Sequence, residues 1–463
     1  MTRNPAIAAV MEQERRGELW RQRVLGYPVW PLERLRRYRG ELLQGALPER
    51  TGPGAPLRGR LQALAAPLRN SVADLQQGLA RHWSGRDVWL LTSSMYRRPD
   101  DDGRMHCIYA HDLQQQLGAR LLLLERTTND LRLTPQDEVL PIDLLHIGAM
   151  MAGKALAPTA ARAVRPQQAQ AFAPLAPAYL AQLAIFGRLL EQATRRLLAA
   201  QRPRAVFVLC AYQPFIPIQR AVRAAGIPLI ELQHGLVHDS HPGYALGEGY
   251  DDSHLPDHIV TFGKHWSSIL DDASPHWRGR QSVGGHPWLR RKHRGSARRQ
   301  RRVVALFSQI DPPVRSQLRQ TALALRTALP QDLRVVIKPH PREVDSESYW
   351  GPLRAEGVEL VERTADSYAL LRDCLLSIAV FSTVAVEALA FGCRSVVMRS
   401  PLWTEDIRLL VDQGKILAAD GADDVVRVLQ SAPPEVDLSL ADALFGVDSP
   451  PLDYERLIAS LQP

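Results

Sequence analysis

Two segments in the C-terminal half each change abruptly from a run of apolar, mostly β-branched residues to polar residues. Residues 335–343 read Val-Val-Ile-Lys-Pro-His-Pro-Arg-Glu, and residues 378–389 read Ile-Ala-Val-Phe-Ser-Thr-Val-Ala-Val-Glu-Ala-Leu. Short apolar runs of this kind are typical of strands that are buried on both faces of a parallel sheet. Ligands of open α/β sheets bind beyond the carboxyl ends of such strands. The two segments therefore predict an α/β fold with a site for a nucleotide-type anion in this half of the chain.

The alternation of strand and helix extends over most of the chain, which favours βαβ units and parallel sheets. Strands are predicted at residues 87–91, 120–125, 205–209, 228–232, 259–263, 303–307, 335–338, 358–361, 378–381 and 395–398, with a further candidate at 281–285. We therefore predict an α/β protein with two doubly wound domains. The predicted division is a helical N-terminal extension (1–86), a first α/β domain (87–254), a second α/β domain (255–432) and a tail that packs back on the body (433–463).

The composition restricts the compartment and the class of partner. The 463 residues carry 57 basic and 49 acidic side chains, a net charge of +8 that favours an anionic partner: nucleic acid, an anionic membrane surface or a phosphorylated substrate. No apolar run is long enough to cross a bilayer, and the N-terminal apolar stretch, Ala6 to Met11, is too short for the core of a signal peptide. The four scattered cysteines form no CxxC pair and indicate reduced thiols. We expect a cytoplasmic protein.

Lys338 and His340 are the first candidate ligand-binding residues. The imidazole lies between Pro339 and Pro341, so it loses little conformational freedom when it engages a ligand. Lys338 would supply charge for a phosphate, and His340 would donate to a phosphate or base, or act as an acid near neutral pH. The alternative is a solvated lysine followed by a histidine that caps a turn.

Ser382, Thr383 and Glu387 form the second candidate set. Ser382 and Thr383 are predicted at a helix N-terminus, where free backbone N–H groups favour phosphate. Glu387 is the only charge in the apolar helix that follows, on nearly the same face as Thr383 and well placed for ribose hydroxyls. The alternative is ordinary helix capping and a carboxylate stabilised by the helix dipole.

His234, in the Gln-His-Gly sequence that ends a predicted strand, is the third candidate and would lie near the reaction centre. The two domains, meeting near residues 235–260, are expected to leave a cleft where residues 233–235 face Lys338, His340, Ser382 and Thr383. The His-, Asp- and Tyr-rich segment 238–254 matches no zinc spacing and is interpreted as a polar loop. Residues 92–94 with Tyr96 to Arg98 would bind an anionic acceptor or merely cap a helix.

Two further observations limit the function classes. The sequence has no GxxxxGK[ST], no GxGxxG at the first βα unit and no GxSxG, so a P-loop enzyme or a serine hydrolase is not expected. The basic run at residues 290–302 contains no acid and is predicted to be a solvated linker or a membrane-facing surface.

These motifs, together with Leu-Pro-Asp-His-Ile-Val-Thr-Phe-Gly at 255–263, resemble bacterial surface-polysaccharide glycosyltransferases of the GT-B fold. The relatives are capsule Kdo transferases, bacterial polysialyltransferases and CDP-glycerol glycerophosphotransferases. The resemblance covers residues 225–400 well, is looser over 87–224 and is absent from 1–86. It implies two Rossmann-like domains and places donor-nucleotide binding on His340, Ser382 and Thr383. Glu387 stands where the glycerophosphotransferases often carry Asp or another residue, and no catalytic base can be matched in the N-terminal half.

The resemblance implies a metal-independent glycosyltransferase with no bound cofactor, which moves a sugar from a CMP-, CDP- or UDP-linked donor to a capsule, O-antigen or related glycan or glycolipid acceptor. His234 would serve as the base or as a contact to the leaving group, with Lys338, His340 and the helix start at Ser382 offsetting the charge. Peripheral contact with an anionic inner membrane is expected, and nucleic-acid binding is not. A nucleotide-sugar epimerase, a glycerophosphotransferase and a non-catalytic basic adaptor remain alternatives.

Overall fold

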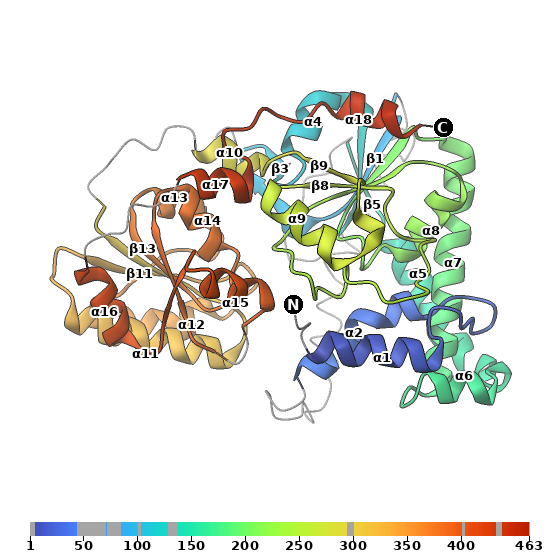
Figure 1. Ribbon diagram of the computed structural model, residues 1–463, viewed down its shortest axis with the longest axis horizontal. Coiled ribbons are helices and arrows are strands. Elements are labelled where there is room, and N and C mark those ends of the chain that lie inside the picture. Colours follow the sequence, from blue (N-terminus) through green and yellow to red (C-terminus); the bar gives the residue numbers. More distant parts are fainter. Residues whose placement is uncertain are drawn as a thin grey trace. The chain divides into compact units, whose positions relative to one another are not determined.

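The computed structural model describes residues 5–43, 71, 85–100, 103–127, 138–293, 301–400, 403–431 and 438–462. The described residues form two compact units (Figure 1). The first unit comprises Met1–Thr261, Ser267–Val283 and Pro451–Pro463, and the second comprises Phe262–Trp266 and Gly284–Pro450. Each unit has its own parallel sheet, which confirms the predicted α/β class with two Rossmann-like domains.

The sheet of the first unit has the order β5-β4-β1-β6-β7-β8-β9, and every neighbouring pair is parallel. Its strands are β1 (Val88–Ser93), β4 (Leu121–Arg126), β5 (Val139–Pro141), β6 (Ala205–Leu209), β7 (Leu229–Leu232), β8 (His258–Thr261) and β9 (Gln281–Val283). A short antiparallel pair, β2 (Arg97–Pro99) and β3 (Met105–Cys107), stands apart from it. Because the order reverses between β1 and β6, the topological switch point of this sheet lies there.

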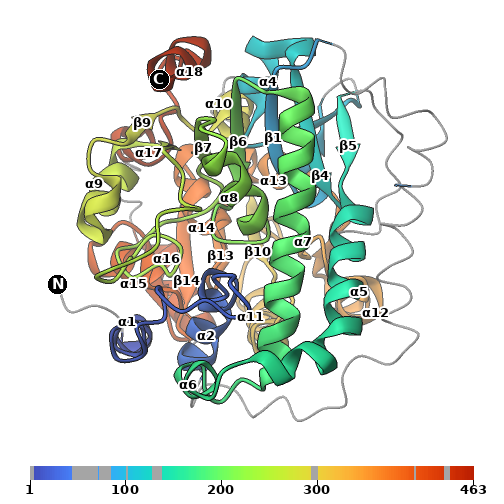
Figure 2. The ribbon, with the colours of Figure 1, turned by 90° about the vertical axis from the view of Figure 1, so that its right-hand side faces the viewer.

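Helices cover both faces of this sheet, which explains why its strands are apolar throughout rather than alternating. Val88 and Leu90 of β1 belong to a core shared with α4 (His111–Leu117) and α18 (Tyr454–Leu461). Trp89 and Leu91 point to the other face, into a core shared with α5 (Asp143–Ala160), α7 (Pro177–Gln201) and α8 (Ile216–Ala224). Figure 2 shows α5 and α7 running side by side along this unit.

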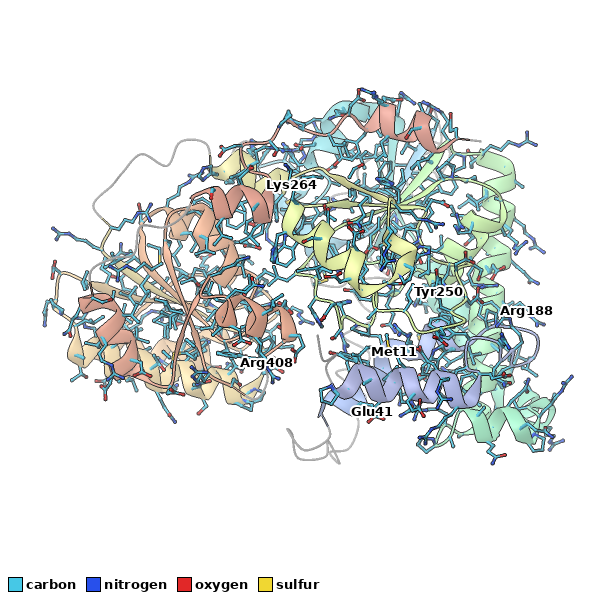
Figure 3. All side chains as sticks on the ribbon, viewed as in Figure 1. Met11, Glu41, Arg188, Tyr250, Lys264 and Arg408 are labelled. Carbon is cyan, nitrogen blue, oxygen red and sulfur yellow. The ribbon has the colours of Figure 1, made fainter. Side chains whose placement is uncertain are left out.

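The N-terminal helices are an integral part of the first unit. A third core joins α1 (Pro5–Gly17) and α2 (Trp30–Leu43) to Phe172, just after α6 (Pro166–Ala171), and to Leu180 of α7. Met11 on α1, labelled in Figure 3, packs against this core. The remainder of the predicted helical extension (1–86) lies largely outside the described residues, because residues 44–70 and 72–84 are not described.

The sheet of the second unit has the order β12-β11-β10-β13-β14-β15 and is also entirely parallel. Its strands are β10 (Val303–Phe307), β11 (Arg334–Lys338), β12 (Glu359–Leu360), β13 (Cys374–Ala379), β14 (Arg394–Met398) and β15 (Leu417–Ala419). Numbered from β10, this is the Rossmann order 3-2-1-4-5-6, whose switch point lies between β10 and β13.

The helices of the second unit are α10 (Pro287–His293), α11 (Pro312–Ala328), α12 (Ser346–Trp350), α13 (Ser367–Arg372), α14 (Val384–Ala390), α15 (Glu405–Asp412), α16 (Ala422–Gln430) and α17 (Leu438–Phe445). Helices α11 to α15 connect the strands of this sheet, whereas α10 precedes β10 and α16 and α17 follow β15. The remaining helix, α9 (Lys264–Ala273), begins among residues of the second unit and continues in the first.

Two expectations from the sequence need correction. Strands β8 and β9 extend the first sheet through β7, whereas the sequence pattern assigned them to the second α/β series. The basic run at 290–302 is not solvated throughout, because residues 290–293 end α10 and the Arg290 side chain is buried. Its guanidinium donates to the carbonyl oxygens of Gly284 and Ser449 at 3.3 and 3.1 Å, so backbone oxygens take the place of the missing acids.

Candidate functional site

The switch point of the second sheet brings together the strand ends that carry four of the predicted donor-binding residues, while Glu387 lies further along α14. Phe307 of β10 is paired with Lys338 of β11, and the amide of Ser308 donates to the Lys338 carbonyl oxygen at 2.9 Å. Beyond β13, the amide of Phe381 donates to Oε1 of Gln309 at 3.4 Å. Hydrogen bonds therefore connect the segments that follow β10, β11 and β13 at the carboxyl edge of the sheet.

Lys338 is buried at this edge and contacts backbone oxygens. Its ammonium donates to the carbonyl oxygens of Pro339 and Arg363 at 2.9 and 2.8 Å, and the side chain is 3% exposed. These bonds connect the loop after β11 with the loop after β12, which makes Lys338 a support of the His340 loop. Its contact with phosphate stays a prediction.

His340 is half-buried on a loop fixed by Glu343. The buried Glu343 carboxylate accepts from the His340 amide at 2.7 Å and from the Trp350 indole at 2.9 Å, and it pairs with Arg315 at 3.1 Å. The Arg342 amide donates to Nδ1 of His340 at 3.1 Å. With Nδ1 acting as an acceptor, the proton of the neutral imidazole is on Nε2.

Ser382 and Thr383 immediately precede α14, as predicted, and both are half-buried. The Ser382 hydroxyl accepts from the Val384 amide at 3.4 Å, whereas the Thr383 side chain makes no capping bond. Glu387 is buried within α14, and its amide donates to the Thr383 carbonyl oxygen at 2.9 Å. These local bonds fit the capping alternative for Ser382, and the donor-binding role of the three residues stays a prediction.

The first sheet presents His234 two residues beyond β7, next to the end of β6. Its Nε2 lies 3.2 Å from the Tyr212 hydroxyl, and the rings of Tyr96 and Tyr109 lie at 5.9 and 6.5 Å. Burial lowers the pKa of His234 to about 4, so the ring is neutral at neutral pH. Among the described residues its buried Nδ1 has no hydrogen-bond partner.

Glu231 in β7 is a buried carboxyl directly beneath this edge and is not a residue that the sequence pattern singled out. Its Oε1 accepts from the Tyr244 hydroxyl at 2.9 Å and from the Ala211 amide at 3.2 Å. Its Oε2 is buried without a hydrogen-bond partner in the described part of the chain. Burial raises the pKa of Glu231 to about 7, so the carboxyl can hold or release a proton near neutral pH.

Tyr212 connects His234 with the loop that carries His241 and Tyr244, and its ring is closely packed there. It contacts His241 and Tyr244 edge-on at centroid distances of 4.8 and 5.7 Å. A Cβ atom on Gly243 would overlap the Tyr212 ring, so only glycine allows this close approach. The Tyr212 hydroxyl, and with it the orientation of the His234 ring, is therefore determined by the loop at Gly243.

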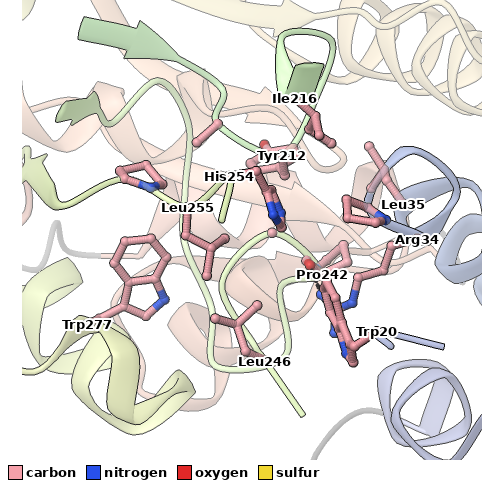
Figure 4. A pocket seen from close by; sticks show the side chains of 14 residues that line it. Trp20, Arg34, Leu35, Tyr212, Ile216, Pro242, Leu246, His254, Leu255 and Trp277 are labelled. Carbon is pink, nitrogen blue, oxygen red and sulfur yellow. Dashed lines mark hydrogen bonds between the residues drawn. The ribbon is translucent and has the colours of Figure 1, made fainter. Parts of the chain in front are cut away.

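Arg34 of α2 holds that loop from the other side. The buried guanidinium pairs with Glu14 at 2.5 Å and donates to the carbonyl oxygens of Pro242 and Ala245. A cavity of about 20 Å³, roughly the space of one water molecule, lies among these groups (Figure 4). In Figure 4 the side chains of Arg34, Tyr212 and His254 surround it. The N-terminal helices, which we expected to form a separate extension, thus help to position His234.

The segment after β1 has mainly structural contacts. Ser93 caps the 3-10 turn Ser94–Tyr96, Arg97 pairs with the buried Glu125 at 2.6 Å, and Arg98 donates to backbone oxygens. These contacts favour the capping alternative over an anion site. Within the described residues, no three His, Cys, Asp or Glu side chains are grouped to hold a metal ion, and no helix is long and apolar enough to span a membrane.

Comparison with known proteins gives structural similarity only. No protein-family model matches the chain, and no curated protein matches it in sequence. Similar solved structures include a UDP-GlcNAc 2-epimerase from Methanocaldococcus jannaschii (TM-score 0.49, 10% identity, 81% of this chain and 99% of that chain). They also include a trehalose 6-phosphate synthase from Burkholderia multivorans (0.46, 13%, 81% and 96%) and the spinosyn rhamnosyltransferase SpnG (0.45, 16%, 81% and 100%). With TM-scores below 0.5, these similarities carry no argument about function.

The sequence did contain a signal for Glu231. Its strand reads Leu-Ile-Glu-Leu, and a carboxylate in a strand buried on both faces is rare unless it is paired or functional. Tyr212 and Gly243 gave no comparable signal, because their importance depends on a contact between loops that the sequence does not reveal.

Proposed function

We propose that this protein is a glycosyltransferase that takes a sugar from a nucleotide-activated donor and transfers it to a glycan or lipid-linked acceptor. The observation that carries the proposal is the convergence of the loops after β10, β11 and β13 at the switch point of a sheet with Rossmann strand order. Nucleotides bind at this position in such sheets. The resemblance of residues 225–400 to surface-polysaccharide glycosyltransferases supports the same assignment.

His340 is suited to a phosphate of the donor. Its Nδ1 accepts from the Arg342 amide, so Nε2 carries the proton and can donate to a phosphate oxygen. The Glu343 contacts fix the loop before the ligand arrives, which reduces the entropy lost on binding. In the proposal, Lys338 supports this loop, Ser382 and Thr383 hydrogen-bond the phosphates, and Glu387 contacts ribose or sugar hydroxyls.

His234 is proposed to receive the proton of the acceptor hydroxyl or to contact the leaving group. Burial keeps His234 neutral, as a base must be, but a pKa of about 4 also makes the ring a weak base at neutral pH. Its unpartnered Nδ1 is an atom that a bound hydroxyl could satisfy. No metal is required, because the donors around His340 would offset the charge of the departing nucleotide.

Nucleotide binding tests the donor site. We expect CMP, CDP, UDP or GDP to raise the melting temperature selectively, by the equivalent of about 2.7 kcal/mol at a ligand concentration of 100 Kd. His340→Ala should abolish this stabilisation while lowering the stability of the unliganded protein by only about 1 kcal/mol. His106→Ala is the matched control, because His106 is also half-buried but lies in β3 of the first unit. Equal nucleotide stabilisation of His340→Ala and wild type would refute the donor site.

Turnover assays separate the remaining alternatives. A glycosyltransferase consumes a nucleotide sugar only with an acceptor, whereas an epimerase converts the free nucleotide sugar alone. A glycerophosphotransferase consumes CDP-glycerol instead. Salt-sensitive nucleic-acid binding without affinity for any nucleotide sugar would identify a basic adaptor and contradict the proposal.

A further inference from the structure

A cavity in the first unit lies at the edge of the sheet opposite to His234. It is formed between the C-terminal ends of α7 and α8, two helices that lie side by side (Figure 2). Helix α7 ends just before β6 and α8 just before β7, so the cavity is at the amino ends of these strands, whereas His234 follows the carboxyl end of β7. Its volume is about 470 Å³, which is within the range of small-molecule sites. We call it the α7–α8 pocket.

The buried part of the α7–α8 pocket is apolar and continuous with a core. Leu198 and Ala221 line the pocket and are buried members of the core that α7 and α8 share with the sheet, and Ile227 packs against the same core. Ala199 and Ala224 also line the pocket and are exposed. Because an alanine side chain ends at Cβ, neither helix end fills the space between them. The pocket can therefore hold an apolar chain in contact with the core.

The charged side chains that line the pocket, among the described residues, are Arg195 and Arg202. Arg195 pairs at 2.6 Å with Glu191, but the same carboxylate also pairs with Arg220 at 3.1 Å, so it does not fully neutralise Arg195. Arg202 is exposed, and no hydrogen bond or ion pair in the described part of the chain involves its guanidinium. The opening of the pocket thus carries an excess of positive charge.

Arg202 also has a backbone conformation that favours glycine. It follows the last residue of α7, its amide donates to the Leu198 carbonyl oxygen at 2.9 Å, and its φ of +44° lies in the left-handed region. Glycine is the usual residue at such a helix end, because a Cβ atom is disfavoured there. A long cationic side chain at this position is less stable than glycine, and such departures persist mainly where the side chain serves a site.

We propose that the α7–α8 pocket binds a small amphiphile with one apolar chain and one anionic head group, a carboxylate or a phosphate monoester. The chain would occupy the apolar part, and the head group would lie at the opening, where the guanidinium groups of Arg202 and Arg195 can donate to it. The helix C-termini disfavour an anion deeper in the pocket, because their free carbonyl oxygens carry partial negative charge. Since the pocket and His234 lie at opposite edges of the sheet, this ligand would be an effector and not a substrate, and the inference does not depend on the transfer reaction.

Isothermal titration calorimetry of the full-length protein with decanoate, below its micelle concentration, tests the pocket. We expect saturable binding at one site that UDP does not displace. Octanoate should bind about 16-fold more weakly, because each buried methylene contributes about fourfold. Decyl phosphate carries the same chain, and the tighter of the two anions identifies the head group. Decyltrimethylammonium, with the same chain and a positive head group, should bind at least about tenfold more weakly than decanoate.

Variants locate the site. Arg202→Gln should weaken decanoate binding about fivefold, the upper range for an exposed ion pair, and Arg202→Gly should do the same without lowering the melting temperature. Arg196→Gln is the matched control, because Arg196 is exposed on the same helix but does not line the pocket. Ala199→Leu with Ala224→Leu should fill the pocket and weaken binding more than about tenfold, since leucine is tolerated at exposed helical positions. Ala155→Leu, at an exposed position of α5, should leave binding unchanged.

The proposal is wrong if the wild type shows no saturable decanoate binding, or if decyltrimethylammonium binds as tightly as decanoate. Equal losses in Arg202→Gln and Arg196→Gln would mean that general positive charge, and not the pocket, attracts the anion. Unchanged binding in the leucine double variant would place the ligand elsewhere on the protein. Either result would overturn the assignment.

Discussion

Glu231→Gln is predicted to stabilise the protein above neutral pH and to remove one titration from its stability profile. Glutamine has nearly the shape of a protonated carboxyl and keeps the oxygen that accepts from Tyr244 and Ala211. Burial raises the pKa of Glu231 from its ordinary value of 4.5 to about 7 in the folded protein. The folded state therefore favours the protonated carboxyl over the carboxylate.

The sign and size of the effect follow from proton linkage. Because the folded pKa is raised, the favourable contribution of Glu231 is complete below pH 4.5 and is lost as the pH rises through about 7. A difference of about 2.5 between the unfolded and folded pKa values corresponds to about 3 kcal/mol, since one pKa unit is worth about 1.36 kcal/mol. The neighbouring hydroxyls do not add to this change, because burial raises the pKa values of Tyr212 and Tyr244 well above their usual range.

Urea unfolding of the wild type and of Glu231→Gln at several values between pH 5 and 9 measures the difference directly, and titrations common to both proteins cancel. The stability of the variant relative to wild type should rise by about 3 kcal/mol across this interval. Glu347→Gln is the control, because Glu347 is exposed and should show no such trend. A difference between Glu231→Gln and wild type that stays flat with pH would show that Glu231 is ionised and paired in the folded protein, and would refute the reasoning.

Three further outcomes are expected. Gly243→Ala should displace the Tyr212 ring and lower the free energy of unfolding in urea by about 1–3 kcal/mol. The displaced Tyr212 hydroxyl should also shift the NMR titration of His234, and an unshifted titration would contradict the dependence of His234 on Gly243. Arg34→Met should cost about 3–5 kcal/mol, because it leaves the buried Glu14 carboxylate without a cation and with only the hydrogen bond from the Trp30 indole. Adding Glu14→Gln should recover much of that loss; no recovery would show that the bonds from Arg34 to the loop dominate. Burial lowers the pKa values of His234, His254 and His286 to between about 3 and 4, so their contribution to stability is complete above pH 6.5 and is lost as the pH falls below it. The test uses Glu231→Gln, which lacks the opposing titration of Glu231; equal stability of this variant by urea unfolding at pH 8 and pH 5 would contradict the prediction.

The strand-and-helix pattern was sufficient to predict two parallel sheets, because each buried strand is a compact apolar run that local sequence reveals. Runs such as residues 205–209 and 303–307 coincide with β6 and β10. The sequence could not assign β8 and β9 to a sheet. Strand partners depend on contacts between distant segments, and the short buried sequence at residues 258–261 would fit a parallel strand of the first sheet as well as one of the second.

The candidate site was predicted unevenly for a similar reason. His340 and Ser382 were recognisable because a strand end followed by polar residues is a local pattern. The structural role of Lys338 could not be recognised from the sequence, because one carbonyl oxygen that it contacts is in its own turn and the other is in a loop 25 residues further along the chain. The support of His234 by Arg34 involves residues about 200 positions apart and has no local signal at all.

Three departures from ordinary stability rules occur at the carboxyl ends of β6 and β7. Cys210 has φ +67°, a left-handed conformation that costs a non-glycine residue of order 1 kcal/mol or more. Glu231 is a buried carboxyl with one unpartnered oxygen, and the buried Nδ1 of His234 has no partner among the described residues. Glycine at 210 and an apolar residue at 231 would avoid two of these costs. Local strain and unsatisfied buried groups persist mainly at functional sites. We therefore expect the acceptor to react at the carboxyl ends of β6 and β7 and not at the segment after β1.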